Sequence, residues 1–262
     1  MCLLVLAVAP RPDLRLVVLA NRDEYHARPT QRLHAWDGAR GVVGGADLEG
    51  GGTWLGVTPE LRFAALTNVR DLRDLGPKEA GERSRGELVR GFLLAGEGAN
   101  VAAERAAGER AMRGFNLVVG DGDGRLWWSS NRAPAPAFRP LGAGVHAVSN
   151  ALLDTPWPKV ERAKRAIEAE LARPGPPDIE ALMAILADRH APPDHVLPDT
   201  GVGIALERAL APICVVMPGY GTRSSTVIVA RADGTTTIVE RTLAPEALGD
   251  VRLELSAGAA VP

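Results

Sequence analysis

The sequence predicts an α+β fold in which two antiparallel sheets pack face to face and helices cover their outer faces, a four-layer αββα sandwich. The chief observation is the order of the expected elements, which runs strands, two helices, strands, two helices, strands. That grouping favours antiparallel sheets over the regular strand–helix alternation of a parallel sheet. No linker, internal repeat or low-complexity segment divides the 262 residues, so we predict a single domain over 1–262.

The first group of strands begins with a hairpin. Two β-rich runs flank the turn-like link Pro10-Arg11-Pro12-Asp13, and shorter runs follow around a glycine-rich loop. The predicted strands lie at 2–9, 14–21, 41–47, 54–58 and 62–68.

Two helices separate this group from the next strands. Ser84-Arg85-Gly86-Glu87 has the spacing of a capping box and predicts a helix start, and a helix rich in Ala, Glu and Arg follows over 102–112. Later, Pro158 suits a first helical turn and Asp178 suits an N-cap. The remaining predictions are strands at 115–121, 126–130 and 144–150, helices at 157–172 and 178–188, and strands at 213–217, 224–230 and 235–242.

The composition excludes several classes of function. A formal net charge of −2 gives no basic surface for nucleic acid or for an anionic membrane. The two cysteines, Cys2 and Cys214, form no zinc spacing, and they indicate a reducing, cytoplasmic setting without a disulfide framework. The apolar run 2–9 has no basic segment before it and is far shorter than the ~20 residues of a membrane span. We expect no metal and no cofactor, a small-molecule ligand, and either a monomer or an oligomer.

Cys2 is the strongest candidate for a catalytic residue. Aminopeptidases remove Met1 when the second residue is small, and the chain would then begin with a thiol beside a free α-amino group of pKa near 8. One residue would supply both the nucleophile and its base. The competing interpretation is that Cys2 is a small buried hydrophobe in an apolar strand.

Polar residues follow several of the predicted strands. Asn21-Arg22-Asp23-Glu24 closes the second strand, and a hairpin would return it to Cys2. An Asp there can hold an α-amino group, and an Arg can lower a thiol pKa or bind a substrate carboxylate. The alternative is a solvated charged turn.

Four more segments are candidates. Asn68 and Asn150 each end a strand, where an amide N–H can stabilise an oxyanion, although Asn also favours turns. Trp54 follows the glycine-rich loop and would either wall a pocket or pack in the core. Arg223 lies among hydroxyl residues and would either orient an anionic group or remain on the surface.

The chain resembles the NRDE family, to which the transport and Golgi organisation proteins belong. The matching segments span nearly the whole sequence: Met1-Cys2-Leu3, ANRDE at 20–24, GGADLEGGGTWLG at 44–56, RFAALTN at 62–68, SRGELV at 84–89, FNLVVGD at 115–121, SNALLDTPWPKVERAK at 149–164, LPDTG at 197–201 and YGTRSSTV at 220–227. The family in turn is similar to the N-terminal-nucleophile hydrolases whose nucleophile is Cys, such as bile-salt hydrolases, penicillin V acylases and acid ceramidase, which share the αββα fold.

This resemblance implies a site. Cys2 would be the nucleophile, Asn68 and Asn150 the oxyanion or amine-orienting groups, and Arg223 the late arginine. The hydrolases usually read Arg-Asn-x-Asp, so Arg22 and Asp23 match by residue type, whereas an ungapped alignment places Glu24 at the Asp position. We assign Glu24, Trp54, Thr67 and Tyr220 to substrate binding.

Two functions are therefore predicted. The first is a cytoplasmic amidohydrolase that cleaves a non-peptide C–N amide of the N-acyl amide type through a Cys acyl-enzyme. The alternative is a non-catalytic protein that binds or transfers a hydrophobic ligand, such as haem, a lipid or an acyl-CoA. Its pocket would be lined by Trp54, Trp127, Trp128 and Trp157.

Overall fold

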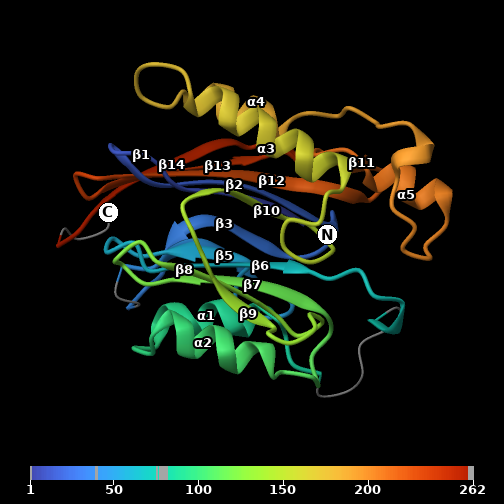
Figure 1. Cartoon of the computed structure of the whole chain (residues 1–262), viewed down its shortest axis with the longest axis horizontal. Helices are drawn as coiled ribbons and strands as arrows, with labels where there is room; N and C mark the ends of the chain where they lie inside the picture. Colours follow the sequence, from blue (N-terminus) through green and yellow to red (C-terminus); the bar gives the residue numbers. More distant parts are fainter. Residues whose placement is uncertain (1, 39–40, 75, 77–81, 259–262) are drawn as a thin grey trace.

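Two antiparallel sheets face each other and helices cover the outer face of each, which confirms the predicted αββα sandwich (Figure 1). A computed structural model describes residues 2–38, 41–74, 76 and 82–258. Within these residues, no helix combines the length and the apolar character needed to cross a membrane.

The first sheet carries the candidate nucleophile on a central strand. Its order is β10-β1-β2-β12-β13-β14, and β11 pairs with β12. The predicted hairpin is present as β1 and β2, with Cys2 opposite Arg22. The strands are β1 (Cys2–Arg11), β2 (Leu14–Tyr25), β10 (Gly144–Val148), β11 (Val216–Met217), β12 (Tyr220–Arg231), β13 (Thr235–Thr242) and β14 (Gly249–Ser256).

The second sheet runs in sequence order, β3-β4-β5-β6-β7-β8-β9, so that each strand pairs with the next one along the chain. Its strand β6 ends on Asn68, at the same end of the molecule as Cys2. The strands are β3 (Thr30–Ala35), β4 (Val43–Asp47), β5 (Leu55–Val57), β6 (Phe63–Asn68), β7 (Phe115–Gly120), β8 (Leu126–Ser130) and β9 (Phe138–Leu141).

Helices form the two outer layers. α3 (Pro158–Leu171) and α4 (Ile179–Leu186) cover the first sheet, and α1 (Gly86–Leu94) and α2 (Ala99–Ala107) cover the second (Figure 1). The Asp178 carboxylate accepts from the amides of Glu180 and Ala181, so the predicted N-cap is confirmed. The chain also forms α5 (Ile204–Leu210) and the short 3₁₀ turns η1 (Leu72–Asp74) and η2 (Asp194–Val196).

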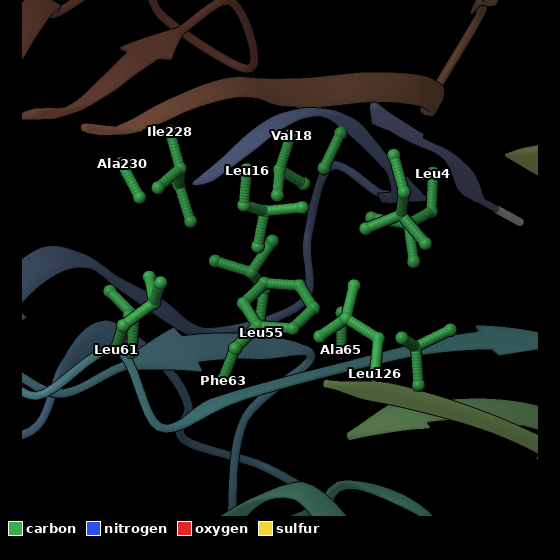
Figure 2. Packing of buried hydrophobic residues seen from close by; sticks show 14 of the residues in the cluster. Leu4, Leu16, Val18, Leu55, Leu61, Phe63, Ala65, Leu126, Ile228 and Ala230 are labelled. Carbon is green, nitrogen blue, oxygen red and sulfur yellow. The ribbon is translucent and has the colours of Figure 1, made fainter. Parts of the chain in front are cut away.

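Strand periodicity explains the layers. On β1, Leu4 and Leu6 point into the core between the sheets, whereas Leu3 and Val5 pack against α3 and α4. Side chains alternate faces along a strand, so a strand that is apolar at every position is buried on both faces. Figure 2 shows the core between the sheets, where Phe63 is completely buried.

The elements that the sequence analysis missed lie at the margins of the structure. β3, β9 and β14 are edge strands, and α5 stands outside the helix pairs. Edge strands have one unpaired side and tolerate polar residues and proline, so their sequences lack the apolar signal of a central strand. The strand predicted at 213–217 is reduced to β11, and the predicted capping box is only half formed. The Ser84 amide donates to Glu87 at 3.3 Å, but the Ser84 hydroxyl faces the Gly51 carbonyl at 3.5 Å.

Candidate functional site

A cavity of about 110 Å³ opens beside Cys2 at the end of β1. Six residues that the sequence analysis had selected line it: Cys2, Arg22, Asp23, Glu24, Trp54 and Asn68. The hairpin register explains the first three, because Cys2 pairs with Arg22 and Asp23 follows directly. The structure therefore joins the start of β1, the end of β2 and the end of β6 in one pocket.

Cys2 is half-buried at the start of β1. Burial raises the pKa of the Cys2 thiol, and the negative charge of Asp23 adds to that effect. The backbone amide of Asp23 and the guanidinium of Arg22 act in the opposite direction. Nucleophilic attack from this position consequently requires a base that accepts the thiol proton.

Arg22 is held between an aromatic ring and a hydroxyl group. Its guanidinium carbon lies 4.2 Å from the centre of the Trp54 ring, and Nη1 donates to Thr30 Oγ1 at 3.1 Å. The side chain is 5% exposed. Trp54 is therefore a pocket wall that fixes the arginine by cation–π stacking.

Asp23 occupies the more buried of the two acidic positions. Its Oδ1 accepts from the Thr222 hydroxyl at 2.6 Å, and Thr222 in turn accepts from the Val215 amide. Burial raises the pKa of Asp23, against the opposing charge of buried Lys159. Glu24 also lines the cavity, but its Oε2 lies 3.8 Å from Arg28 Nε. The geometry favours Asp23 over Glu24 for contact with the residue that carries the thiol.

Asn68 and Asn150 meet, but only Asn68 lines the cavity. Asn150 Nδ2 donates to the Asn68 carbonyl at 2.9 Å. The neighbouring Ser149 hydroxyl donates to the Cys2 carbonyl at 3.1 Å. Asn150 thus ties the end of β6 to the segment that follows β10, and its amide nitrogen is already engaged.

Four residues of the predicted site lie off the cavity wall: Asn150, Thr67, Tyr220 and Arg223. Thr67 Oγ1 accepts from Asn116 Nδ2 at 3.1 Å in a buried contact. Tyr220 packs edge-on against Tyr25 and reaches the Asp23 carbonyl at 3.4 Å, behind the pocket. Thr67 and Tyr220 support their neighbours, and neither borders the space where a substrate would lie.

Arg223 is displaced by a bulge. Thr222 pairs with Asp23 and Ser224 pairs with Arg22, so Arg223 is the extra residue between them. Its Nη1 donates to the carbonyl of Arg28 and, at 3.1 Å, to Thr30 Oγ1. Arg223 therefore braces the link between β2 and β3 and does not border the Cys2 cavity.

Five polar residues of the wall were missed: Arg28, Asp47, Thr53, Ser84 and Arg85. Arg28 Nη2 and Asp47 Oδ2 form an ion pair at 2.8 Å. Arg85 precedes α1, and its Nη1 donates to the Gly114 carbonyl at 3.0 Å. The SRGELV segment contained the signal for Arg85, but an arginine at a helix start usually faces solvent.

The glycine-rich loop allows this wall to form. A Cβ atom on Gly52 would lie 2.4 Å from the carbonyl carbon of Gly86, and Gly52 has a φ of +77°. The Thr53 amide donates to the Gly86 carbonyl at 3.3 Å. This close backbone approach joins the loop to the start of α1.

The tryptophans of the alternative function do not converge. Trp128 is buried between the sheets, Trp127 packs near α2, and Trp157 lies 5.2 Å from the Arg70 guanidinium. Only Trp54 borders the Cys2 cavity. No group of His, Cys, Asp and Glu side chains within the described ranges is arranged to hold a metal ion.

Fold and cavity together define an αββα protein with a cysteine at the start of a central strand. The chain belongs to the transport and Golgi organisation 2 family, whose family model matches residues 1–245. The human transport and Golgi organization protein 2 homolog is 35% identical over 265 residues, which cover 93% of each chain. The Drosophila melanogaster protein is 26% identical, covering 89% of this chain and 88% of its own.

Two solved structures were also compared. One is a Caenorhabditis elegans N-acylethanolamine-hydrolyzing acid amidase ortholog, with a TM-score of 0.45 and 13% identity over 87% of this chain and 92% of that one. The other is the C2A mutant of conjugated bile acid hydrolase from Clostridium perfringens, with a TM-score of 0.47 and 8% identity over 97% of this chain and 92% of that one.

Proposed function

We propose that this protein is an N-terminal-cysteine amidohydrolase that cleaves a non-peptide C–N amide. The observation that carries the proposal is the cavity in which Cys2, Arg22, Asp23 and Asn68 meet. These four side chains supply a nucleophile, a cation, a carboxylate and an amide donor, the set that acyl transfer through a thiol requires.

In the proposed reaction, removal of Met1 exposes the α-amino group of Cys2, and Asp23 holds that group. The amine takes the thiol proton while Sγ bonds to the substrate carbonyl carbon. The carbonyl oxygen becomes an oxyanion that accepts from the Asn68 side-chain amide. The C–N bond then breaks, and the leaving amine takes the proton from the α-ammonium group. Water attacks the thioester, the α-amine accepts its proton, and a carboxylic acid leaves as Cys2 regains its thiol.

Asn150 acts as a positioning residue in this scheme. It accepts from the backbone amide of Arg70 at 2.7 Å and donates to the Asn68 carbonyl, so it fixes the segment that carries the oxyanion donor. Removal of one oxyanion donor typically lowers kcat by about 10²–10³. Asn68→Ala should therefore show a loss of that order.

The test combines intact mass with activity. We expect the purified chain to have the mass of the form without Met1, and to hydrolyse a member of a panel of N-acyl amino acids, N-acyl homoserine lactones and penicillin V. Cys2→Ala should be inactive, whereas Cys214→Ala, which changes the other buried cysteine, should retain activity. Acid-quenched wild-type protein should carry the acyl group on Cys2. Retention of Met1, or turnover by Cys2→Ala, would refute the proposal.

The alternative of a non-catalytic carrier for haem, a lipid or an acyl-CoA makes the opposite prediction for Cys2. Under that function, Cys2→Ala would keep its ligand and its cellular role. Titration of the wild type and of Cys2→Ala with haem, followed by absorbance, separates the two functions.

A further inference from the structure

Two arginines of the Cys2 cavity have no carboxylate partner among the described residues. Arg22 is fixed by Trp54 and Thr30, and Arg85 by the Gly114 carbonyl. Neither forms an ion pair within the described part of the chain, although both border the cavity. A guanidinium has five N–H donors, so one hydrogen bond to a protein group leaves most of its capacity open.

The carboxylates of the cavity are already engaged elsewhere. Asp47 and Glu24 both face Arg28, at 2.8 and 3.8 Å, and Asp23 accepts from Thr222. Arg28 is therefore neutralised within the structure, whereas Arg22 and Arg85 keep their charge. Burial lowers the pKa of Arg85, against the opposing charge of Asp74, and Arg85 forms no ion pair within the described residues.

Three features limit what would bind between these arginines. The cavity of about 110 Å³ has room for roughly four water molecules at about 30 Å³ each, so it suits a small group and not a long chain. The wall at Ser84 to Gly86 is the start of α1, whose backbone amides favour negative charge. Guanidinium groups bind carboxylate and phosphate through paired hydrogen bonds.

We propose that Arg85 and Arg22 clamp a compact anionic group, a carboxylate or a phosphate, on the substrate of this site. This inference rests on the proposed amidohydrolase function, which supplies the reaction. It narrows the substrate to an N-acyl compound in which the group on the nitrogen side of the amide is small and negatively charged. An N-acyl amino acid and an N-acyl phosphoethanolamine both have this chemistry. Arg85 is then a specificity residue, in a segment that the sequence indicated only as the start of a helix.

Binding tests the clamp without turnover. Calorimetry on Cys2→Ala protein would use N-hexanoylglycine, N-hexanoylglycinamide and N-hexanoylphosphoethanolamine. The glycine and glycinamide probes differ only in the charge of the small group. Hydrogen bonds to a charged group contribute enough for a difference of roughly 10- to 100-fold in Kd. Whichever anionic probe binds more tightly identifies carboxylate or phosphate as the natural group.

Variants of the arginines test whether Arg85 causes the preference for anionic probes. In the Cys2→Ala background, Arg85→Gln should remove most of the advantage of the anionic probes, and Arg85→Lys should restore part of it. Arg90→Gln is the matched control, because Arg90 is exposed on the same helix. Thermal melts will show that each variant is folded. Equal binding of glycine and glycinamide probes, or an anion preference that survives Arg85→Gln, would overturn the clamp. Anion-selective binding without hydrolysis by the wild type would instead refute the amidohydrolase and leave the clamp standing.

Discussion

Breaking the buried ion pair between Arg70 and Glu207 should strongly destabilise the protein. Arg70 Nη1 lies 2.5 Å from Glu207 Oε2, and the two side chains are only 6% and 3% exposed. Glu207 Oε1 also accepts from the amide of Thr200 at 2.8 Å. Glu207→Gln keeps the size of the side chain but leaves the Arg70 charge buried opposite a neutral amide.

The expected cost follows from burial. Removing one partner of a buried ion pair typically costs about 3–5 kcal/mol, because the remaining charge loses the counter-charge that offset its desolvation. For a chain of this size each kcal/mol lowers Tm by about 2–4 °C, so Glu207→Gln should lower it by roughly 6–20 °C. The backbone amide of Arg70 also donates to the Asn150 carbonyl, so Glu207→Gln should make the segment that holds Asn68 and Asn150 less rigid.

The same helix supplies the control. Arg208 Nη2 and Asp194 Oδ2 lie 2.6 Å apart, nearly the same distance, but these side chains are 53% and 51% exposed. Solvent screens an exposed ion pair, which contributes little to stability, so Asp194→Asn should hardly change Tm. Urea denaturation of both variants gives the free energies of unfolding. A loss under about 1 kcal/mol for Glu207→Gln, or equal losses for the two variants, would contradict the role of burial.

Three further outcomes are expected. Phe63→Ala should lower the free energy of unfolding by about 3–5 kcal/mol in urea denaturation, because this completely buried ring fills the core between the sheets. A loss under about 1 kcal/mol would contradict that packing. In a Cys214→Ala background, Arg22→Met should move the midpoint of iodoacetamide alkylation of Cys2 to higher pH, because the Arg22 guanidinium lowers the pKa of that thiol; an unchanged midpoint would contradict this effect of Arg22. Groups that include His146 lower the pKa of Asp154 to about 2. The ionised Asp154 therefore contributes about 1–2 kcal/mol, after solvent screening, to the free energy of unfolding. This stabilisation is present above about pH 4 and is lost as the pH falls towards about 2. Urea denaturation of the wild type and Asp154→Asn should therefore converge at low pH, and a constant difference would exclude this linkage.

The central strands and the nucleophile's surroundings were predictable because their patterns are local. Continuous apolar runs on both sides of a turn-like link identified β1 and β2, and the register of a hairpin places the residues after Asn21 beside Cys2. Asn68 was found for a similar reason, since it ends a central strand whose apolar pattern is clear.

The positions of Arg223 and Arg85 depend on contacts between distant segments. The bulge on β12 becomes visible only when β12 is paired with β2, roughly two hundred residues away in the sequence. Arg85 is half-buried, and it borders the cavity at the point where the glycine loop before β5 meets the start of α1. Neither the bulge nor the contact between the loop and α1 produces a pattern within a short stretch of sequence. The sequence therefore identifies residues of the site more readily than it predicts where their side chains lie.

The pairing of β2 with β12 also has a consequence for synthesis on the ribosome. Cys2 and Asp23 are made among the first residues, but Thr222, which holds the Asp23 carboxylate, is made only after most of the chain. Non-local strand pairs form slowly, and until β12 docks, the edge of β2 is open to other strands. The pocket can therefore be completed only near the end of translation, and a chain interrupted before residue 220 would expose its nucleophile on an unfinished sheet.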